Sequence, residues 1–185
     1  MAWATRGLRG STLEEMINLT NETYRVKKLA LIQKIPTPIN PLKLNNADRT
    51  ITLAYFEQKS TVDYIGVIQG VPVAFDAKET GRKSLPIQNI HAHQIDFMDD
   101  YERQGGLAFL IVHFNFYDEY YYLPFVVLKK YWLGSKAGKR KSIPYAAFEK
   151  DFLINSRKGH LLHYIEAVER HLERLRLNGE TNKTN

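Results

Sequence analysis

The chain has 185 residues, with 26 Lys and Arg against 20 Asp and Glu, so its formal net charge is +6. Hydrophobic residues make up 44% and charged residues 25% of the chain, which is ordinary globular usage and excludes a collagen-like or disordered protein. Cysteine is absent, which excludes disulfide scaffolds, thiolate metal sites and cysteine nucleophiles.

The length of the chain predicts a single domain over residues 1–185. The longest apolar run, 107–114, has the length of a strand and falls well below the roughly 18 residues of a membrane span. The N-terminus lacks the apolar segment of a signal peptide. We therefore expect a soluble intracellular protein located in the cytoplasm.

The first expected element is an amphipathic helix over 12–25, because apolar side chains recur there at helical spacing. Ser11 can cap this helix, and Glu14 three residues later completes a capping box. A strand is expected at 26–34, directly after the helix.

The segment 36–57 is expected to form a projecting, hairpin-like arm. Its prolines interrupt regular pairing, and a turn precedes a strand at 49–57. A tight β-hairpin follows the arm, with strands at 61–68 and 71–78 that are joined at Gln69-Gly70.

The remainder alternates helices and strands. A helix at 88–104 leads to strands at 107–114 and 119–127, followed by a helical turn near 145–150. The last helix is expected from about 160 to 177, and the polar tail 178–185 is expected to fray. This order of elements predicts an α/β fold.

Positive charge is concentrated in two segments. Residues 1–50 have a local charge of +4 and residues 134–158 a local charge of +5. Small residues in the second segment predict a mobile loop whose cations can hold the phosphates of a polyanion. A solvated surface loop explains the same pattern equally well. The cations of this loop are Lys136, Lys139, Arg140 and Lys141.

The strongest chemical signal is a pair of acids in the expected hairpin. A two-residue turn at 69–70 puts Asp63 opposite Asp76 on the neighbouring strand. Their Cβ atoms would lie about 5 Å apart, and two carboxylates at that distance repel each other. A divalent cation makes the pair tolerable, and Mg²⁺ uses sites with one or two carboxylates, a few neutral oxygens and substrate phosphate.

A lysine accompanies the acids. Lys78 lies two residues after Asp76, so a strand directs both side chains to one face. Its ammonium group could orient or deprotonate a water molecule and stabilise charge that develops on phosphate. Thr61 would share the face of Asp63 and offer a further oxygen ligand. The pattern predicts metal-assisted phosphodiester hydrolysis, although spacing alone leaves a surface salt bridge as an alternative.

These motifs are part of a wider similarity over roughly residues 6–148. The chain resembles the RecU-type Holliday junction resolvases, which have the restriction-endonuclease-like PD-(D/E)XK fold, a mixed sheet flanked by helices. The similar segments are Arg9-Gly10, Leu13-Glu14, Pro36-Thr37-Pro38, Ala54-Tyr55-Phe56, Ser60-Thr61-Val62-Asp63-Tyr64, Phe75-Asp76-Ala77-Lys78-Glu79-Thr80, His91-Ala92-His93-Gln94-Ile95 and Ile143-Pro144-Tyr145.

The resemblance implies a role for each matching residue. Lys78 corresponds to the catalytic lysine, and Glu14 to an acid near the catalytic centre, although a capping box explains Glu14 without catalysis. The arm corresponds to the family's stalk, which projects into the junction. The implied ligands of Mg²⁺, for which Mn²⁺ can substitute, are Thr61, Asp63, Asp76 and Gln94. The expected DNA contacts are Arg6, Arg9, Tyr55, Phe56 and the four cations of the loop.

The chain departs from the family pattern in two ways. The family commonly has Glu at the position of Asp76, which shortens this side chain by one methylene group. The loop from Asp76 to Gln94 is also one residue shorter than in relatives. Both differences bear on metal geometry, but neither removes a functional group.

The implied activity is Mg²⁺-dependent endonuclease cleavage of four-way DNA junctions by paired nicks that leave 5′-phosphate ends. A junction has two-fold symmetry, so two matched nicks require a homodimer. Recombinase and branch-migration proteins are implied as further partners, and the DNA substrate implies a nucleoid-associated protein. Two alternatives remain: a nuclease of the same fold that cuts linear duplex, and a non-catalytic protein that binds DNA or modulates a recombinase.

Other polar clusters have simpler explanations. His91 and His93 would point to different faces of a helix, which favours surface or capping roles. His160, His163 and Glu166 have a spacing that could hold zinc, but without an HExxH pattern a solvated helix face is favoured. A group of tyrosines is expected in a core or dimer face, with base stacking as the weaker alternative. These are Tyr117, Tyr120, Tyr121 and Tyr122.

Overall fold

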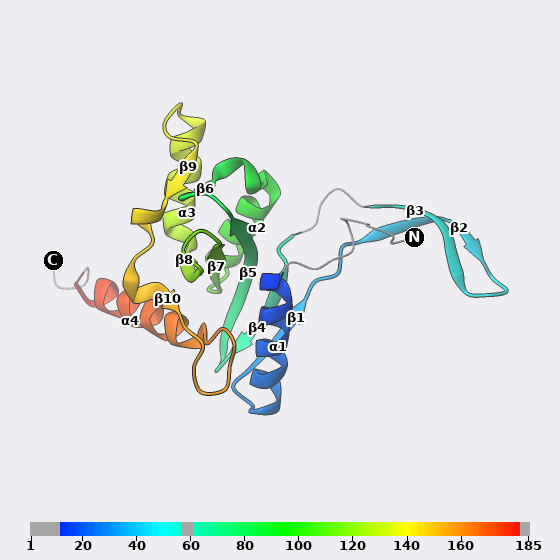
Figure 1. Ribbon diagram of the computed structural model, residues 1–185, viewed down its shortest axis with the longest axis horizontal. Helices are drawn as coiled ribbons and strands as arrows, with labels where there is room; N and C mark the ends of the chain where they lie inside the picture. Colours follow the sequence, from blue (N-terminus) through cyan, green and yellow to red (C-terminus); the bar gives the residue numbers. More distant parts are fainter. Residues whose placement is uncertain (1–11, 57–60, 182–185) are drawn as a thin grey trace.

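The computed structural model describes residues 12–56 and 61–181. Its centre is a six-stranded sheet in the order β1-β4-β5-β7-β8-β10 (Figure 1). The β5 and β7 strands pair in parallel and the other neighbours are antiparallel, so the predicted mixed sheet is confirmed. The strands are β1 (Ala30–Lys34), β4 (Tyr64–Ile68), β5 (Val71–Thr80), β7 (Leu107–Phe114), β8 (Glu119–Pro124) and β10 (Leu153–Ile154).

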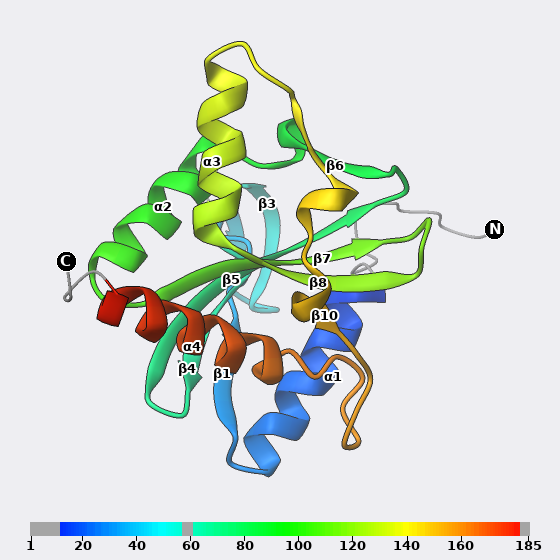
Figure 2. The same ribbon diagram turned by 90° about the vertical axis from the view of Figure 1, so that its left-hand side faces the viewer.

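Helices cover both faces of this sheet (Figure 2). The helices α1 (Thr12–Val26) and α4 (Ile165–Thr181) pack on one face, and α2 (Ala92–Arg103) and α3 (Phe125–Lys136) on the other. Every residue of β7 is buried, as expected for a strand that is covered on two sides. None of the helices in the described ranges is both long and apolar enough to span a membrane.

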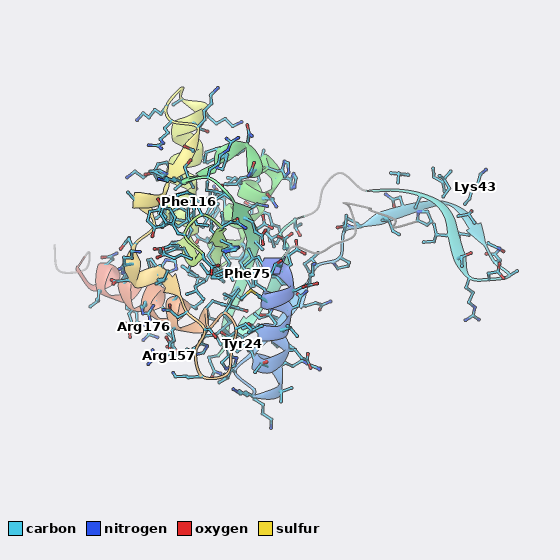
Figure 3. All side chains as sticks on the ribbon, viewed as in Figure 1. Tyr24, Lys43, Phe75, Phe116, Arg157 and Arg176 are labelled. Carbon is cyan, nitrogen blue, oxygen red and sulfur yellow. The ribbon has the colours of Figure 1, made fainter. Side chains whose placement is uncertain are left out.

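Each face of the sheet has its own apolar core. Phe75, labelled in Figure 3, stacks between Tyr64 and Phe109 in the core under α1 and α4, with ring centroids 4.8 Å from each. Ala74 and Leu110 belong to the opposite core, under α2 and α3. Because side chains alternate along a strand, Asp76 and Lys78 share the α2 face with Ala74.

An arm projects from this body, as the prolines predict (Figure 1). It is an antiparallel hairpin of β2 (Ile39–Asn45) and β3 (Thr50–Phe56), whose register shifts after Pro41 and again after Lys43. Its apolar side chains are exposed, including Leu42 at 61% and Leu44 at 62%. The hairpin therefore has little core of its own.

Short elements complete the fold. Two small strands form a separate antiparallel pair beyond the central sheet, and single 3₁₀ turns connect the larger elements. These elements are β6 (Ser84–Pro86), β9 (Ser142–Pro144), η1 (Ile87–Asn89), η2 (Tyr145–Ala147) and η3 (Lys150–Phe152).

The largest error of the sequence interpretation concerns α3. The sequence predicts a strand through 119–127, but β8 ends at Pro124 and a helix begins at Phe125. The β-branched pair Val126-Val127 favours a strand locally, whereas Phe125 and Leu128 bury the apolar face of the helix. Lys136 consequently ends a helix and does not lie in a mobile loop.

Other boundaries also differ from expectation, and the helix expected at 88–104 begins only at Ala92. The α1 helix continues to Val26, so the strand expected at 26–34 begins only at Ala30. The last helix begins at Ile165 and reaches Thr181, which includes the first residues of the tail expected to fray. Residues 182–185 lie outside the described part of the chain.

Candidate active site

Asp63 and Asp76 meet where β4 and β5 pair. Tyr64 is the partner of Phe75, so the register expected from the two-residue turn is confirmed. The backbone N–H of Asp63 donates to Asp76 Oδ1 at 3.2 Å, and the N–H of Ala77 donates to Asp63 Oδ2 at 3.0 Å. Each carboxylate is thereby held by the opposite strand.

Lys78 and Gln94 converge on the other oxygen of Asp76. Lys78 Nζ lies 2.5 Å from Asp76 Oδ2, and Gln94 Nε2 donates to the same oxygen at 2.6 Å. Asp76 is completely buried, while the Lys78 side chain keeps 16% of its surface exposed. The structure therefore joins a buried carboxylate to a lysine whose side chain is partly exposed.

The surroundings of Asp63 disfavour its negative charge. Burial, a hydrogen bond with Asp76 and the negative charge of Asp76 raise the pKa of Asp63 to about 7, although the Ala77 N–H and the Lys78 charge oppose this. Lys78 alone therefore does not compensate both negative charges at neutral pH.

The donor set suits a divalent cation. Two carboxylates offer the hard oxygen ligands that Mg²⁺ prefers, and this ion normally keeps several water molecules. No group of three or more His, Asp or Glu around a common point occurs within residues 12–56 and 61–181. Asp63 and Asp76 would therefore be the principal protein ligands.

The amide of Gln94 is already engaged on both sides. Its Oε1 accepts the backbone N–H of His91 at 3.1 Å, which caps α2, and its Nε2 faces Asp76. To bind a metal as the resemblance implies, Gln94 would have to turn its oxygen toward the pair. Its present hydrogen bonds instead position Asp76.

Thr61 and Glu14 are the remaining expected site residues within the described part of the chain. Thr61 is partly buried in the segment before β4, and since the strand begins only at Tyr64, strand alternation does not fix its direction.

Glu14, on α1, pairs with Lys34 Nζ at 2.5 Å. Burial raises the pKa of Tyr64, and the charges of Glu14, Asp63 and Asp76 raise it further. The charge of Glu14 therefore acts on Tyr64, the residue that follows Asp63. Ser11, its expected capping partner, lies outside the described residues.

Sequence interpretation missed the role of Glu79. Its Oε1 accepts the backbone N–H of Leu13 at 2.9 Å, so it caps the start of α1 from the end of β5. Glu79 directly follows Lys78, so strand alternation places it on the opposite face of the sheet. This alternation is the sequence pattern that indicates a role for Glu79 away from the carboxylate pair. Glu79 thereby couples the strand that carries the site to the helix that carries Glu14.

The expected DNA contacts are spread over the molecule. Lys139, Arg140 and Lys141 follow α3 in the turn that leads to β9, far along the helix from the sheet (Figure 2). Lys136 lies over the Trp132 ring at 4.7 Å. On the arm, Tyr55 is 53% exposed. Arg6 and Arg9 lie outside the described residues, as does the side chain of Phe56.

The histidines differ from their expected arrangement. His91 and His93 do not point to separate helix faces: His91 precedes α2 in an extended conformation, and the two rings stack at 5.4 Å. His160 and His163 are not on a solvated helix face, because α4 begins after them and both are buried. Their rings stack at 4.8 Å, and His163 Nδ1 lies 3.0 Å from the Tyr24 hydroxyl.

Comparison with known proteins gives consistent matches along the chain. The sequence profile of the family described as Recombination protein U matches residues 8–170. The Holliday junction resolvase RecU of Oenococcus oeni is 43% identical over 169 residues, which cover 89% of this chain and 86% of that protein. The protein of the same name from Latilactobacillus sakei is 42% identical over 173 residues, covering 91% and 82%.

A solved structure is also similar. Archaeoglobus fulgidus Hjc, a Holliday junction resolvase from an archaeal hyperthermophile, aligns with a TM-score of 0.47 and 11% identity. The alignment covers 75% of this chain and 91% of that one.

Proposed function

We propose that this chain, which belongs to the Recombination protein U family, is an endonuclease that resolves four-way DNA junctions. The observation that carries the proposal is the convergence of Asp63, Asp76 and Lys78 at one point of the sheet. This convergence occurs in a chain whose relatives, over most of their length, are named Holliday junction resolvases.

The chemistry assigned to the site is hydrolysis of a phosphodiester bond. Water attacks phosphorus and the 3′-oxygen leaves, so the product carries a 5′-phosphate. Lys78 orients the water and stabilises negative charge on the phosphate, while Gln94 holds Asp76 in place. Mg²⁺, or Mn²⁺ in its place, would supply when bound a positive charge that neutralises the carboxylate pair and the phosphate.

The rest of the molecule is assigned to substrate binding. The arm would recognise the shape of the crossover, and the cations at the end of α3 would hold duplex arms through phosphates. Two symmetric nicks require two sites, so we propose a homodimer, with recombinase and branch-migration proteins as further partners. Action on chromosomal DNA would place the protein with the nucleoid in a bacterial cytoplasm.

Cleavage of a synthetic four-way junction tests the proposal. We expect symmetric nicks in Mg²⁺ or Mn²⁺, none in EDTA, and much slower cutting of linear duplexes with the same arm sequences. Asp76→Asn and Lys78→Met should abolish nicking while junction binding persists.

The two alternative functions predict different results. Equal cleavage of linear duplex would indicate a duplex nuclease. Junction binding without metal-dependent cleavage by the wild type would indicate a binding or recombinase-modulating protein.

A further inference from the structure

Two aromatic side chains project from the turn 115–118, between β7 and β8. Phe116 is 58% exposed and Tyr117 is 37% exposed. Their rings lie edge to face with centroids 4.9 Å apart. Adjacent exposed aromatic rings are unusual on a free surface and commonly mark a contact site.

A hydrogen-bonded group packs against Tyr117. Tyr117 stacks on Tyr145 with ring centroids 4.2 Å apart. The hydroxyl of Tyr145 donates to Glu119, and Lys150 Nζ lies 2.9 Å from that hydroxyl. Tyr117 is therefore already packed before a partner binds, which lowers the entropic cost of binding at this ring.

The turn lies at the end of the strand that carries the candidate active site. The N–H of Asn115 donates to the carbonyl of Thr80, the last residue of β5, at 3.0 Å. Lys78 is paired with Val112 on the neighbouring strand, and Phe116 follows Val112 by four residues, which is at most roughly 13 Å along the chain. Tyr145 packs against the core on the α2 face, which also carries Asp76 and Lys78.

Positive charge accompanies the exposed rings. Lys83 Nζ lies 4.6 Å from the centroid of the Phe116 ring, and its neighbour Arg82 is exposed in the turn between β5 and β6. This turn and the turn 115–118 lie side by side at one end of the sheet (Figure 2). Aromatic rings beside cations are complementary to a nucleobase and its phosphate.

We propose that Phe116, held edge to face by Tyr117, is a stacking platform for an unpaired nucleobase of the DNA strand that crosses β5, with Lys83 holding the adjacent phosphate. The proposal rests on the proposed function and deepens it, because it names a nucleotide that has left its stack near the branch point as the ligand. Every base has a π-face, so the platform selects structure and not sequence.

Binding and cleavage of a four-way junction by variants test the platform. Phe116→Ala should weaken junction binding in EDTA about 5- to 160-fold, the range of one lost base stack. Phe116→Trp should bind as wild type does, whereas Phe116→Leu should not restore binding. Val126→Ala, at another exposed apolar position (63%), serves as the matched control and should have no effect.

Abasic nucleotides identify the stacked base. A junction that lacks one base near the cut should bind wild type as weakly as the intact junction binds Phe116→Ala, and combining the two changes should cause no further loss. Three results would overturn the platform. They are binding by Phe116→Ala that equals wild type, full binding by Phe116→Leu, and additive losses at every abasic position. Because binding is measured without metal, a wild type that fails to cleave contradicts the proposed function and leaves this test intact.

Discussion

Gln94 Nε2 donates to the buried Asp76 Oδ2 at 2.6 Å while Gln94 Oε1 accepts the N–H of His91, so one side chain joins the start of α2 to the carboxylate pair. The position of the helix and the orientation of Asp76 are thus coupled.

Replacement of Gln94 tests this coupling. Gln94→Ala removes the donor to Asp76 and the acceptor for His91, and should lower the free energy of unfolding by about 1–3 kcal/mol. Gln94→Glu keeps the acceptor but adds a third negative charge, so it should be destabilised in EDTA and gain more than wild type from Mg²⁺. Thermal unfolding with and without Mg²⁺ measures both effects, and a Gln94→Glu variant as stable as wild type in EDTA would contradict the coupling.

Neutralising one acid should stabilise the metal-free protein. The pKa of Asp63 is raised to about 7 in the folded protein, so its ionisation costs stability as the pH rises from the unfolded value toward 7. Asp63→Asn should therefore raise the free energy of unfolding by about 1–4 kcal/mol at pH 8 in EDTA, while cleavage is lost. Chemical denaturation measures the change. Asp100→Asn, at an acid whose side chain is 76% exposed, is the control and should change stability little.

Glu79 should contribute to stability as a helix cap. Glu79→Ala leaves the N–H of Leu13 without its acceptor and should cost about 0.5–2 kcal/mol, whereas Glu79→Gln keeps an oxygen and should cost less. If α1 also places Glu14, Glu79→Ala should slow junction cleavage without changing its dependence on Mg²⁺ concentration. Denaturation and single-turnover cleavage separate the two effects; equal stabilities of the Ala and Gln variants would argue against capping.

His171 should make the fold sensitive to acid. Burial, followed by the charge of Arg174, lowers the pKa of His171 to about 4, and its Nδ1 lies 2.7 Å from the Tyr122 hydroxyl. The unfolded chain binds this proton near pH 6.5 and the folded chain only near 4, so stability is lost as the pH falls through that window. Between neutral pH and a pH below 4, this one group lowers the free energy of unfolding by about 3 kcal/mol.

Denaturation at several pH values measures the contribution of His171. His171→Gln should show a shallower loss of stability between pH 6.5 and 4 than wild type. Parallel pH profiles of the two proteins would exclude the imidazole as the source.

The sequence determined the central geometry of the site because that geometry is local. Gln69 and Gly70 both have positive φ, 47° and 87°, which gives a two-residue hairpin turn and a single register. That register alone brings Asp63 to Asp76, and strand alternation adds Lys78. The mixed sheet and the projecting arm likewise follow from the order of apolar runs and prolines.

Long-range packing decided the rest. Residues 125–127 carry aromatic and β-branched side chains that favour a strand locally, whereas burial of Phe125 and Leu128 against the sheet favours a helix. Gln94 and Glu79 acquire their roles from hydrogen-bond partners that are 18 and 66 residues away in the sequence. Tyr121 and Tyr122 are buried, whereas the nearby Tyr117 is exposed because it lies in the turn before their strand. Such contacts depend on which elements become neighbours after folding. The spacing of residue types along the chain does not specify these neighbours.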